Sequence, residues 1–134
     1  MSENDLPRDI EPTLRLVPLP KDTNAAGDIF GGWIMSWVDL AGSVAASRRA
    51  NGRIATVAVN AFQFHKPVFV TDVVSFYARV QRVGTTSVTV EVKVYAQRGW
   101  RTQSGECVLV TDATLTYVAL DAEGRKRPVP PVVS

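Results

Sequence analysis

The chain has 134 residues, enough for one domain with a hydrophobic core, and 46% of them are apolar. Its net charge of +2 and the scattered positions of its basic residues argue against a nucleic-acid partner. A single cysteine, Cys107, excludes an intrachain disulfide, and no apolar run is long enough for a membrane span or a secretory signal, so we expect a cytoplasmic protein.

The predicted elements begin after a polar segment at residues 1–12, which we expect to be a flexible leader. Residues 13–17 read Thr-Leu-Arg-Leu-Val and lie between two prolines, which favours a short strand. Residues 20–28 are dense in loop-forming residue types, so we expect the strand to lead into a loop.

One helix is predicted from Gly32 to about Ala50, because the segment lacks proline and is rich in helix-favouring residues. Asn51-Gly52 marks its end, since these residue types commonly follow the last helical turn. Apolar residues lie on nearly every side of its middle, so we expect it to be buried on most sides. We expect Trp33 and Trp37, four positions apart, to pack as a pair or to line a cavity.

The remaining sequence predicts four longer strands, at residues 54–64, 73–83, 87–95 and 106–120. Valines occupy every second position of the third of these, so one of its faces should meet the core. Short connections between the strands imply antiparallel pairing. We therefore expect an α+β fold at residues 13–121, with a curled antiparallel sheet of about five strands around one long helix. Residues 122–134 form a basic, proline-rich tail.

Asp39 is the clearest candidate for a functional side chain, because it lies in the middle of the apolar helix. An unpaired carboxylate in an apolar interior is strongly unfavourable. Asp39 could therefore face solvent, or pair with Arg48 or Arg53 in a structural role. The functional interpretation is a general base or a nucleophile in a cleft.

Gly31 and Gly32 open the helix, where backbone N–H groups are free and the helix dipole is positive. They are a candidate seat for an oxyanion, although a glycine pair is also common in turns. Gly32 and Asp39 lie on nearly the same helix face but about 10 Å apart along the axis. One carbonyl cannot touch both, so we expect a second copy of the chain to contribute its own Asp39.

Asn24, in the loop before the helix, could hold a water or a substrate carbonyl, or serve only the turn. The sequence shows no nucleophile elbow, no phosphate-binding loop and no His/Cys spacing typical of a metal site. We expect His65, the only histidine, to be a strand-end residue without a catalytic role. We expect Cys107 to be a small core residue and not a nucleophile.

Residues 22–33, which read Asp-Thr-Asn-Ala-Ala-Gly-Asp-Ile-Phe-Gly-Gly-Trp, together with Val38-Asp39, resemble the hot-dog acyl-CoA thioesterases and among them the bacterial YciA group. Three later segments, at residues 64–68, 84–88 and 113–121, are also similar to that group, as is the proline-rich end. The likeness covers nearly the whole chain, from about residue 13 to residue 131.

The resemblance implies a curled sheet wrapped around one helix, and a homodimer with a continuous sheet that assembles further into a hexamer, a trimer of dimers. It implies hydrolysis of acyl-CoA to a free carboxylic acid and CoA, without a metal or another cofactor. In this family an asparagine before the helix and an acid on the partner's helix form the site, and these positions hold Asn24 and Asp39 here. Phe30 stands where many relatives have histidine, so no histidine is expected to contact the oxyanion.

The resemblance also implies a CoA site, in which a turn and two nearby basic residues would meet the nucleotide or its phosphates. Each of these is also an ordinary hairpin or strand-end residue type. The implied residues are Gly84, Thr85, Thr86 and Ser87 in the turn, with Arg82 and Lys66.

The sequence therefore predicts an acyl-CoA thioesterase in which the thioester oxygen lies on the N–H groups near Gly31 and Gly32. Asn24 would position the carbonyl or the water, and Asp39 of the partner subunit would activate the water or attack directly. Two alternatives stay open, a hot-dog hydratase or dehydratase and a non-catalytic acyl-CoA-binding module. Four aromatic side chains could floor an acyl tunnel, namely Trp33, Trp37, Phe62 and Phe64.

Overall fold

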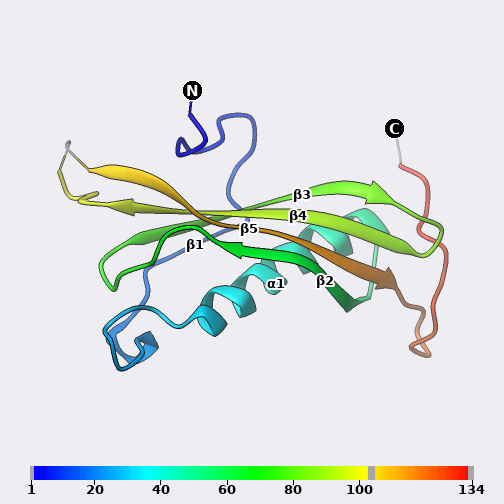
Figure 1. Cartoon of the computed structure of the whole chain (residues 1–134). Helices are drawn as coiled ribbons and strands as arrows, with labels where there is room; N and C mark the ends of the chain where they lie inside the picture. The colour runs from blue at the N-terminus through cyan, green and yellow to red at the C-terminus, as the bar shows by residue number, and fades with distance from the viewer. Residues whose placement is uncertain (1, 103–104, 133–134) are drawn as a thin grey trace.

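The computed structural model describes residues 2–102 and 105–132 (Figure 1). The predicted helix and all five predicted strands are present. The largest differences are that β4 continues three residues beyond the expected end and that Gly31 joins the helix. In chain order the elements are β1 (Leu14–Leu16), the short 3₁₀ helix η1 (Pro20–Asp22), α1 (Gly31–Ala50), β2 (Ile54–Phe64), β3 (Val73–Val83), β4 (Ser87–Arg98) and β5 (Glu106–Ala119).

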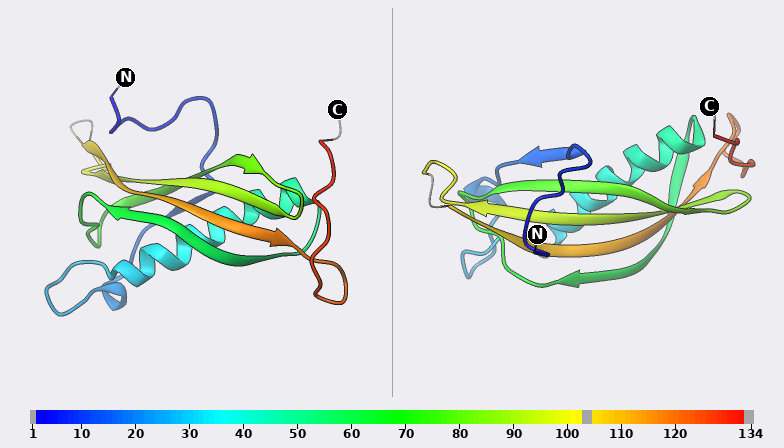
Figure 2. Two further views of the ribbon diagram at one scale, coloured as in Figure 1. Left: turned by 45° about the vertical axis from the view of Figure 1, so that its right-hand side comes forward. Right: turned by 90° about the horizontal axis from the view of Figure 1, so that it is seen from above.

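The five strands form one antiparallel sheet in the order β1-β3-β4-β5-β2. Helix α1 runs diagonally across one face of this curved sheet (Figures 1 and 2). Strand β2 lies at one edge of the sheet and pairs with β5 on its inner side. This arrangement confirms the predicted α+β architecture of a curled sheet around one helix.

The core fills the space between α1 and the sheet. The alternating valines of β4 are fully buried there, as the sequence pattern predicts: Val88, Val90, Val92 and Val94. Burial of each such side chain contributes roughly 1.5–3 kcal/mol. From the helix, Val38 and the small residues Ala41 and Ala46 meet the sheet, and their size allows a close approach of helix and strands.

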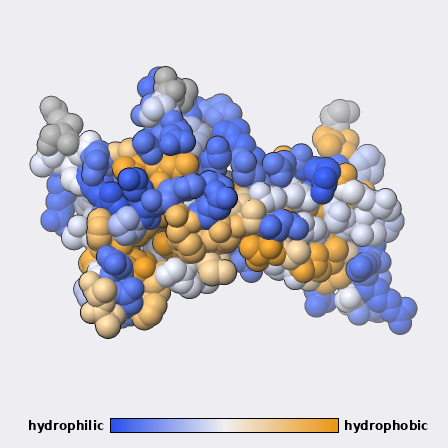
Figure 3. Space-filling model, viewed as in Figure 1, coloured by the Kyte–Doolittle hydropathy of each residue, from blue (hydrophilic) through white to orange (hydrophobic). Residues whose placement is uncertain are grey.

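Helix α1 also exposes apolar side chains. Met35 is 43% exposed and Leu40 is 44% exposed, so part of the helix surface that we expected to be buried is open in a single chain. The exposed apolar surface includes Val57 and Val59 of β2, and apolar areas are visible near both elements in Figure 3. No helix within residues 2–102 and 105–132 is long and apolar enough to cross a membrane.

Residues 2–12, expected to be a flexible leader, lie on the face of the sheet opposite α1 (Figure 1). Leu6 and Ile10 pack there on a small buried cluster of Tyr77, Tyr95 and Leu109. The guanidinium of Arg79 donates two hydrogen bonds of 2.7 Å to the Asp9 carboxylate. The segment therefore has packing and polar contacts that the sequence did not predict.

The described part of the basic tail folds back across the end of the sheet (Figure 2). The Arg127 guanidinium donates to the carbonyl oxygens of Leu120 and Ala50, at 2.9 and 2.8 Å. The backbone N–H of Val129 donates to the carbonyl oxygen of Thr85, at 2.8 Å. These contacts join the tail to the end of α1 and to the turn between β3 and β4.

Candidate active site

Asp39 lies half-buried in the middle of α1, beside β2 and β5. Its carboxylate oxygen Oδ1 accepts a hydrogen bond of 2.8 Å from the Thr56 hydroxyl. The Tyr117 hydroxyl lies 3.1 Å from the same oxygen and 3.0 Å from the Asp39 carbonyl oxygen. Asp39 forms no ion pair with the described residues, so pairing with Arg48 or Arg53 is not its role in this chain.

Tyr117 reaches Asp39 because residue 42 is a glycine. A Cβ atom at Gly42 would overlap the Tyr117 hydroxyl, so any other residue would displace the ring. Burial, together with the charge of Asp39 and the hydrogen bond to it, raises the pKa of Tyr117 well above its ordinary value. The phenol therefore stays protonated and remains a hydrogen-bond donor to Asp39.

The N-terminus of α1 carries two free backbone donors. The N–H groups of Gly31 and Gly32 have no hydrogen-bond partner among the described residues, and the N-cap residue Phe30 supplies no side-chain acceptor. Helix N-termini bind negative charge through such groups. The structure thus gives this helix end the two free N–H groups that the predicted oxyanion seat requires.

Asn24 adds a third donor near the same helix end. Its Oδ1 atom accepts hydrogen bonds from the N–H groups of Ala26 and Asp28, at 2.9 and 3.2 Å. These bonds fix which side of the amide carries the oxygen. The Nδ2 group has no partner among the described residues, so Asn24 can donate to an external acceptor such as a carbonyl oxygen.

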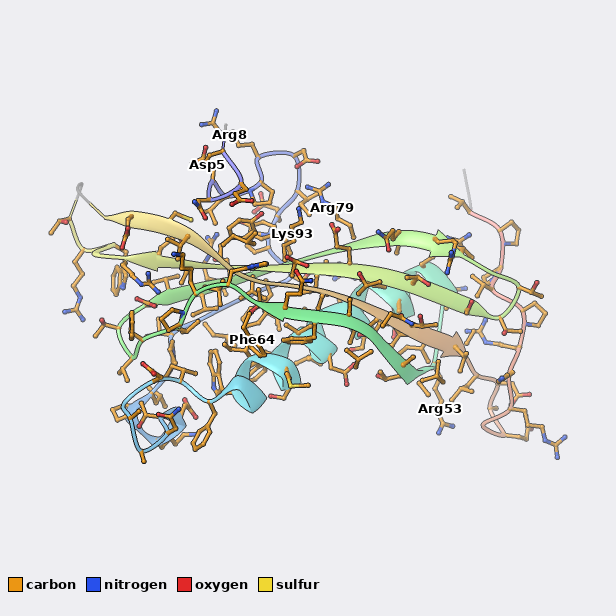
Figure 4. All side chains as sticks on the ribbon, viewed as in Figure 1. Asp5, Arg8, Arg53, Phe64, Arg79 and Lys93 are labelled. Atoms are coloured by element: carbon orange, nitrogen blue, oxygen red, sulfur yellow. The ribbon has the colours of Figure 1, made fainter. Side chains whose placement is uncertain are left out.

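A cavity of about 400 Å³ lies beside these donors, within the size range of small-molecule sites, roughly 300–1,000 Å³. The Phe64 ring lines it and lies against the start of α1, with Cζ 3.4 Å from where a Cβ of Gly31 would be (Figure 4). Phe64 is the one member of the predicted aromatic set that lines it. The lining residues are Asn24, Asp28, Ile29, Gly31, Ile34, Phe64, His65, Lys66, Pro67 and Val68.

The other predicted aromatic residues pack elsewhere. Trp33 and Trp37 form the expected pair, edge to face with ring centroids 6.3 Å apart. Trp33 also packs on Phe76 in the core, at 6.4 Å. Phe62 does not line the cavity but contacts Phe64, with ring centroids 4.9 Å apart.

His65 follows the end of β2, as expected. Its backbone N–H donates to the Val110 carbonyl oxygen at 2.7 Å, and its ring Nε2 lies 2.5 Å from Oδ2 of Asp112. The ring is thus held by a carboxylate on the neighbouring strand. Lys66, a predicted CoA contact, lines the cavity beside it with an exposed side chain.

The predicted CoA-binding turn lies at the other end of the sheet (Figure 1). Along the ladder, Phe64 is level with Val94, whereas the turn ends at Ser87. The seven residue steps from Ser87 to Val94 along β4 span about 23 Å at about 3.3 Å per residue. The turn is closed by a hydrogen bond of 2.8 Å from the Gly84 N–H to the Ser87 carbonyl oxygen.

Asp39 lies at the same end of the sheet as this turn and not at the end that holds the cavity. Its partner Thr56 pairs with Tyr117, and Tyr117 pairs with Val88, the residue after the turn. One chain therefore separates the predicted residues into two groups. The cavity group contains Asn24, Gly31 and Lys66, which line the cavity, and Gly32, which follows Gly31 in α1. The turn group contains Asp39, Arg82, Gly84, Thr85, Thr86 and Ser87.

Sequence reasoning missed three residues around Asp39. Thr56 and Tyr117 occur in strands whose alternation gives no hint of a shared hydrogen-bond partner. Gly42 stands out only as one of several small residues on the helix, which indicates close packing but not what packs there.

Cys107 is half-buried and packs against the outer cluster of the sheet, not in the core between helix and sheet. Burial raises the pKa of its thiol, which disfavours the reactive thiolate. Within the described ranges, no group of three or more His, Cys, Asp or Glu side chains could hold a metal ion.

Comparison with known proteins gives concordant matches. A family model described as the thioesterase superfamily matches residues 26–103. An uncharacterized acyl-CoA thioester hydrolase of Haemophilus influenzae is 46% identical over 117 residues, which cover 87% of this chain and 76% of that protein. The acyl-CoA thioester hydrolase YciA of Salmonella typhimurium is 43% identical over 120 residues, which cover 90% of each chain.

A solved structure shows the same agreement in three dimensions. The hexameric hotdog fold thioesterase of Campylobacter jejuni superposes with a TM-score of 0.85 at 43% sequence identity. The match covers 92% of this chain and 93% of that chain, so the similarity extends over nearly the whole fold.

Proposed function

We propose, from the premise that this chain belongs to the thioesterase superfamily and is an acyl-CoA thioester hydrolase, that two copies of it build each active site. The observation that carries this proposal is the separation of the two residue groups within one chain. The cavity group supplies N–H donors, and the turn group supplies a carboxylate held by hydroxyl groups. Hydrolysis of a thioester needs both.

The edge strand β2 offers the surface for a second copy. Its free edge carries unpaired backbone groups, and its exposed Val57 and Val59 lie beside them. Two β2 strands that pair antiparallel about a two-fold axis would place the Thr56 end of one next to the Phe64 end of the other. The partner's carboxylate would then approach the cavity and the N-terminus of α1.

Such a dimer would extend the sheet across both subunits. It would also cover the apolar side chains that α1 exposes, Met35 and Leu40. We propose that dimers assemble further into a trimer of dimers, which the hexameric Campylobacter jejuni structure supports. The enzyme needs no added cofactor in this proposal, because CoA enters as part of the substrate and leaves as product.

The reaction would then proceed as follows. The thioester carbonyl oxygen accepts hydrogen bonds from the free N–H groups near Gly31 and Gly32, with Asn24 Nδ2 as a further donor. Asp39 of the second copy either removes a proton from the attacking water or attacks the carbonyl carbon itself. A C–O bond forms and the C–S bond breaks. If Asp39 itself attacks, the product is an anhydride on Asp39, which water then hydrolyses to release the acid and regenerate the carboxylate. The sulfur leaves as a thiolate, whose low proton affinity makes a strong general acid unnecessary.

The substrate's nucleotide would extend toward the turn of the second copy, which lies at the same end as its Asp39. Arg82 and the turn formed by Gly84, Thr85, Thr86 and Ser87 would meet the phosphates there, and Lys66 would meet them from the cavity side. In this arrangement the N-terminus of α1 in one copy faces the turn of the other copy. Both copies would therefore contribute to the CoA site, as they do to the catalytic site.

A thiol-release assay with purified protein and a panel of acyl-CoA thioesters from short to long tests the proposal. Asp39→Asn keeps the shape of the side chain and removes its charge. We expect turnover to fall at least about 100-fold, by analogy with the loss of other groups that act at the reacting atoms. Turnover near that of the wild type would contradict the role assigned to Asp39.

A further inference from the structure

The two oxygens of the Asp39 carboxylate have different surroundings. Oδ1 is 2.8 Å from the Thr56 hydroxyl and 3.1 Å from the Tyr117 hydroxyl. Oδ2 has no hydrogen-bond partner among the described residues. Because both hydroxyl groups donate to Oδ1, the carboxylate has a fixed orientation. Its other oxygen, Oδ2, is then the one free to react.

We propose that Tyr117 is a positioning residue that holds Oδ1 of Asp39 and thereby presents Oδ2 to the thioester or to the attacking water. This inference rests on the proposed role of Asp39 in hydrolysis. Beyond that role, it identifies Oδ2 as the reacting atom and Tyr117 as the side chain that orients the carboxylate.

Tyr117 suits this task better than Thr56 alone. Thr56 is exposed on the edge strand and can rotate, whereas Tyr117 is fully buried in the core. The Tyr117 hydroxyl also lies 3.0 Å from the Asp39 backbone carbonyl, so it contacts both the side chain and the helix that carries it. A donor fixed by core packing therefore orients a carboxylate that is itself only half-buried.

The glycine at position 42 also supports a specific contact between Tyr117 and Asp39. Glycine is a poor residue for the middle of a helix. At this position it leaves the space that the Tyr117 hydroxyl occupies, since a Cβ would overlap that atom. The chain thus places a weak helix former where it permits the approach of Tyr117 to Asp39. If the Tyr117 hydroxyl needed only a hydrogen-bond acceptor of any kind, it would not need this space beside Asp39 on the helix.

Tyr117→Phe removes the hydroxyl and keeps the ring in the core. We expect kcat to fall roughly 3- to 10-fold, the factor that corresponds to one net hydrogen bond, with KM for acyl-CoA changed less than about twofold. Tyr95→Phe is the matched control, because it removes the hydroxyl of another buried tyrosine on the far face of the sheet. It should leave both constants unchanged. A wild-type kcat in Tyr117→Phe, or a change confined to KM, would overturn the proposal.

A second pair of variants, at Thr56 on the exposed edge strand, tests the shared oxygen. Thr56→Ser keeps a hydroxyl and should stay near the wild type, whereas Thr56→Val should lower kcat. Each hydroxyl keeps a weaker hold on Oδ1 when the other is removed, so each single variant should lose part of its activity. The double variant Thr56→Val/Tyr117→Phe loses both donors and should lose more than the product of the two single losses. Losses that simply multiply, or a Thr56→Val enzyme as active as the wild type, would refute selection of one oxygen.

Asp39→Asn in the same assay separates this inference from the proposed function. If Asp39→Asn keeps wild-type turnover, the assignment of Asp39 itself fails, and the inference about Tyr117 fails with it. If Asp39→Asn is inactive while Tyr117→Phe equals the wild type, the proposed function stands and only the positioning role is wrong.

Discussion

The Phe64 ring lies against Gly31, the first residue of α1, with Cζ 3.4 Å from where a Cβ of that glycine would be. The contact places an aromatic wall directly beside the free N–H groups of the helix. Phe64 is also half exposed, because the cavity that it lines is open. In the proposed complex, Phe64 would border the reacting carbonyl and would meet the start of the acyl chain.

Phe64→Ala should widen the cavity and shift the acyl preference toward longer or bulkier chains. Removal of the ring leaves apolar space next to the proposed carbonyl site, and a longer acyl chain can fill it. Each Å² of apolar surface buried there contributes about 25 cal/mol to the binding free energy. The measurement is kcat/KM across an acyl-CoA series. Phe69→Ala is the control, since Phe69 is a partly exposed phenylalanine that does not line the cavity. An unchanged ranking of substrates in Phe64→Ala would contradict a contact with the acyl chain.

Mixing two inactive variants tests the shared active site. We expect Asn24→Ala and Asp39→Asn each to have little activity alone. In a mixed dimer, one site has both defects and the other has the native Asn24 and the native Asp39. Random exchange of subunits at equal amounts makes about half of the dimers mixed, so activity should return to about a quarter of the wild-type value. If Asn24 and Asp39 of the same chain worked together, mixing would restore nothing.

Arg127→Ala should destabilise the chain, because its guanidinium bonds two carbonyl oxygens that mark the ends of α1 and β5. Loss of hydrogen bonds to a charged donor costs about 1.5–3 kcal/mol in the free energy of unfolding, measurable by urea denaturation. Arg125→Ala is the control. Arg125 is exposed and its side chain bonds none of the described residues, so we expect a change within about 0.5 kcal/mol. Equal stability of the two variants would show that the tail is not anchored by Arg127.

The contact of Asp9 with Arg79 should make attachment of residues 2–12 depend on pH. The hydrogen bonds from Arg79 lower the pKa of Asp9 from 3.8 to about 2. A carboxylate whose pKa is lower in the folded state stabilises that state at any pH above its pKa in the unfolded chain. This contribution is lost as the pH falls through its pKa in the folded state. We therefore expect the segment to stay attached at pH 5 and to loosen between about pH 4 and pH 2.

Hydrogen exchange at Leu109 reports on this attachment, because its N–H donates to the Asn4 side chain at 2.9 Å. Asp9→Asn should speed exchange of that N–H at pH 5 relative to the wild type. The difference between the two proteins should shrink toward pH 2, where the wild-type carboxyl is also neutral. A difference that stays constant over this range would argue against the ion pair as its cause.

The sequence by itself determined the elements and named most of the candidate residues. The valine alternation in β4 and the proline-free helix are local patterns, and local patterns fix local structure. Asp39 was visible for the same reason, as a charge inside an apolar helix. Gly31 and Gly32 were visible because they open that helix.

Only the tertiary structure decided what surrounds Asp39 and where the predicted residues lie relative to each other. Thr56 and Tyr117 are 17 and 78 residues from Asp39 in sequence, and no periodicity connects them. Strand order placed β2 at the edge and put the cavity and the turn at opposite ends of the sheet. Pairing between distant strands arises from packing of the whole core, so a local pattern cannot predict it. That packing is why one chain holds its two groups of candidate residues at opposite ends of the sheet.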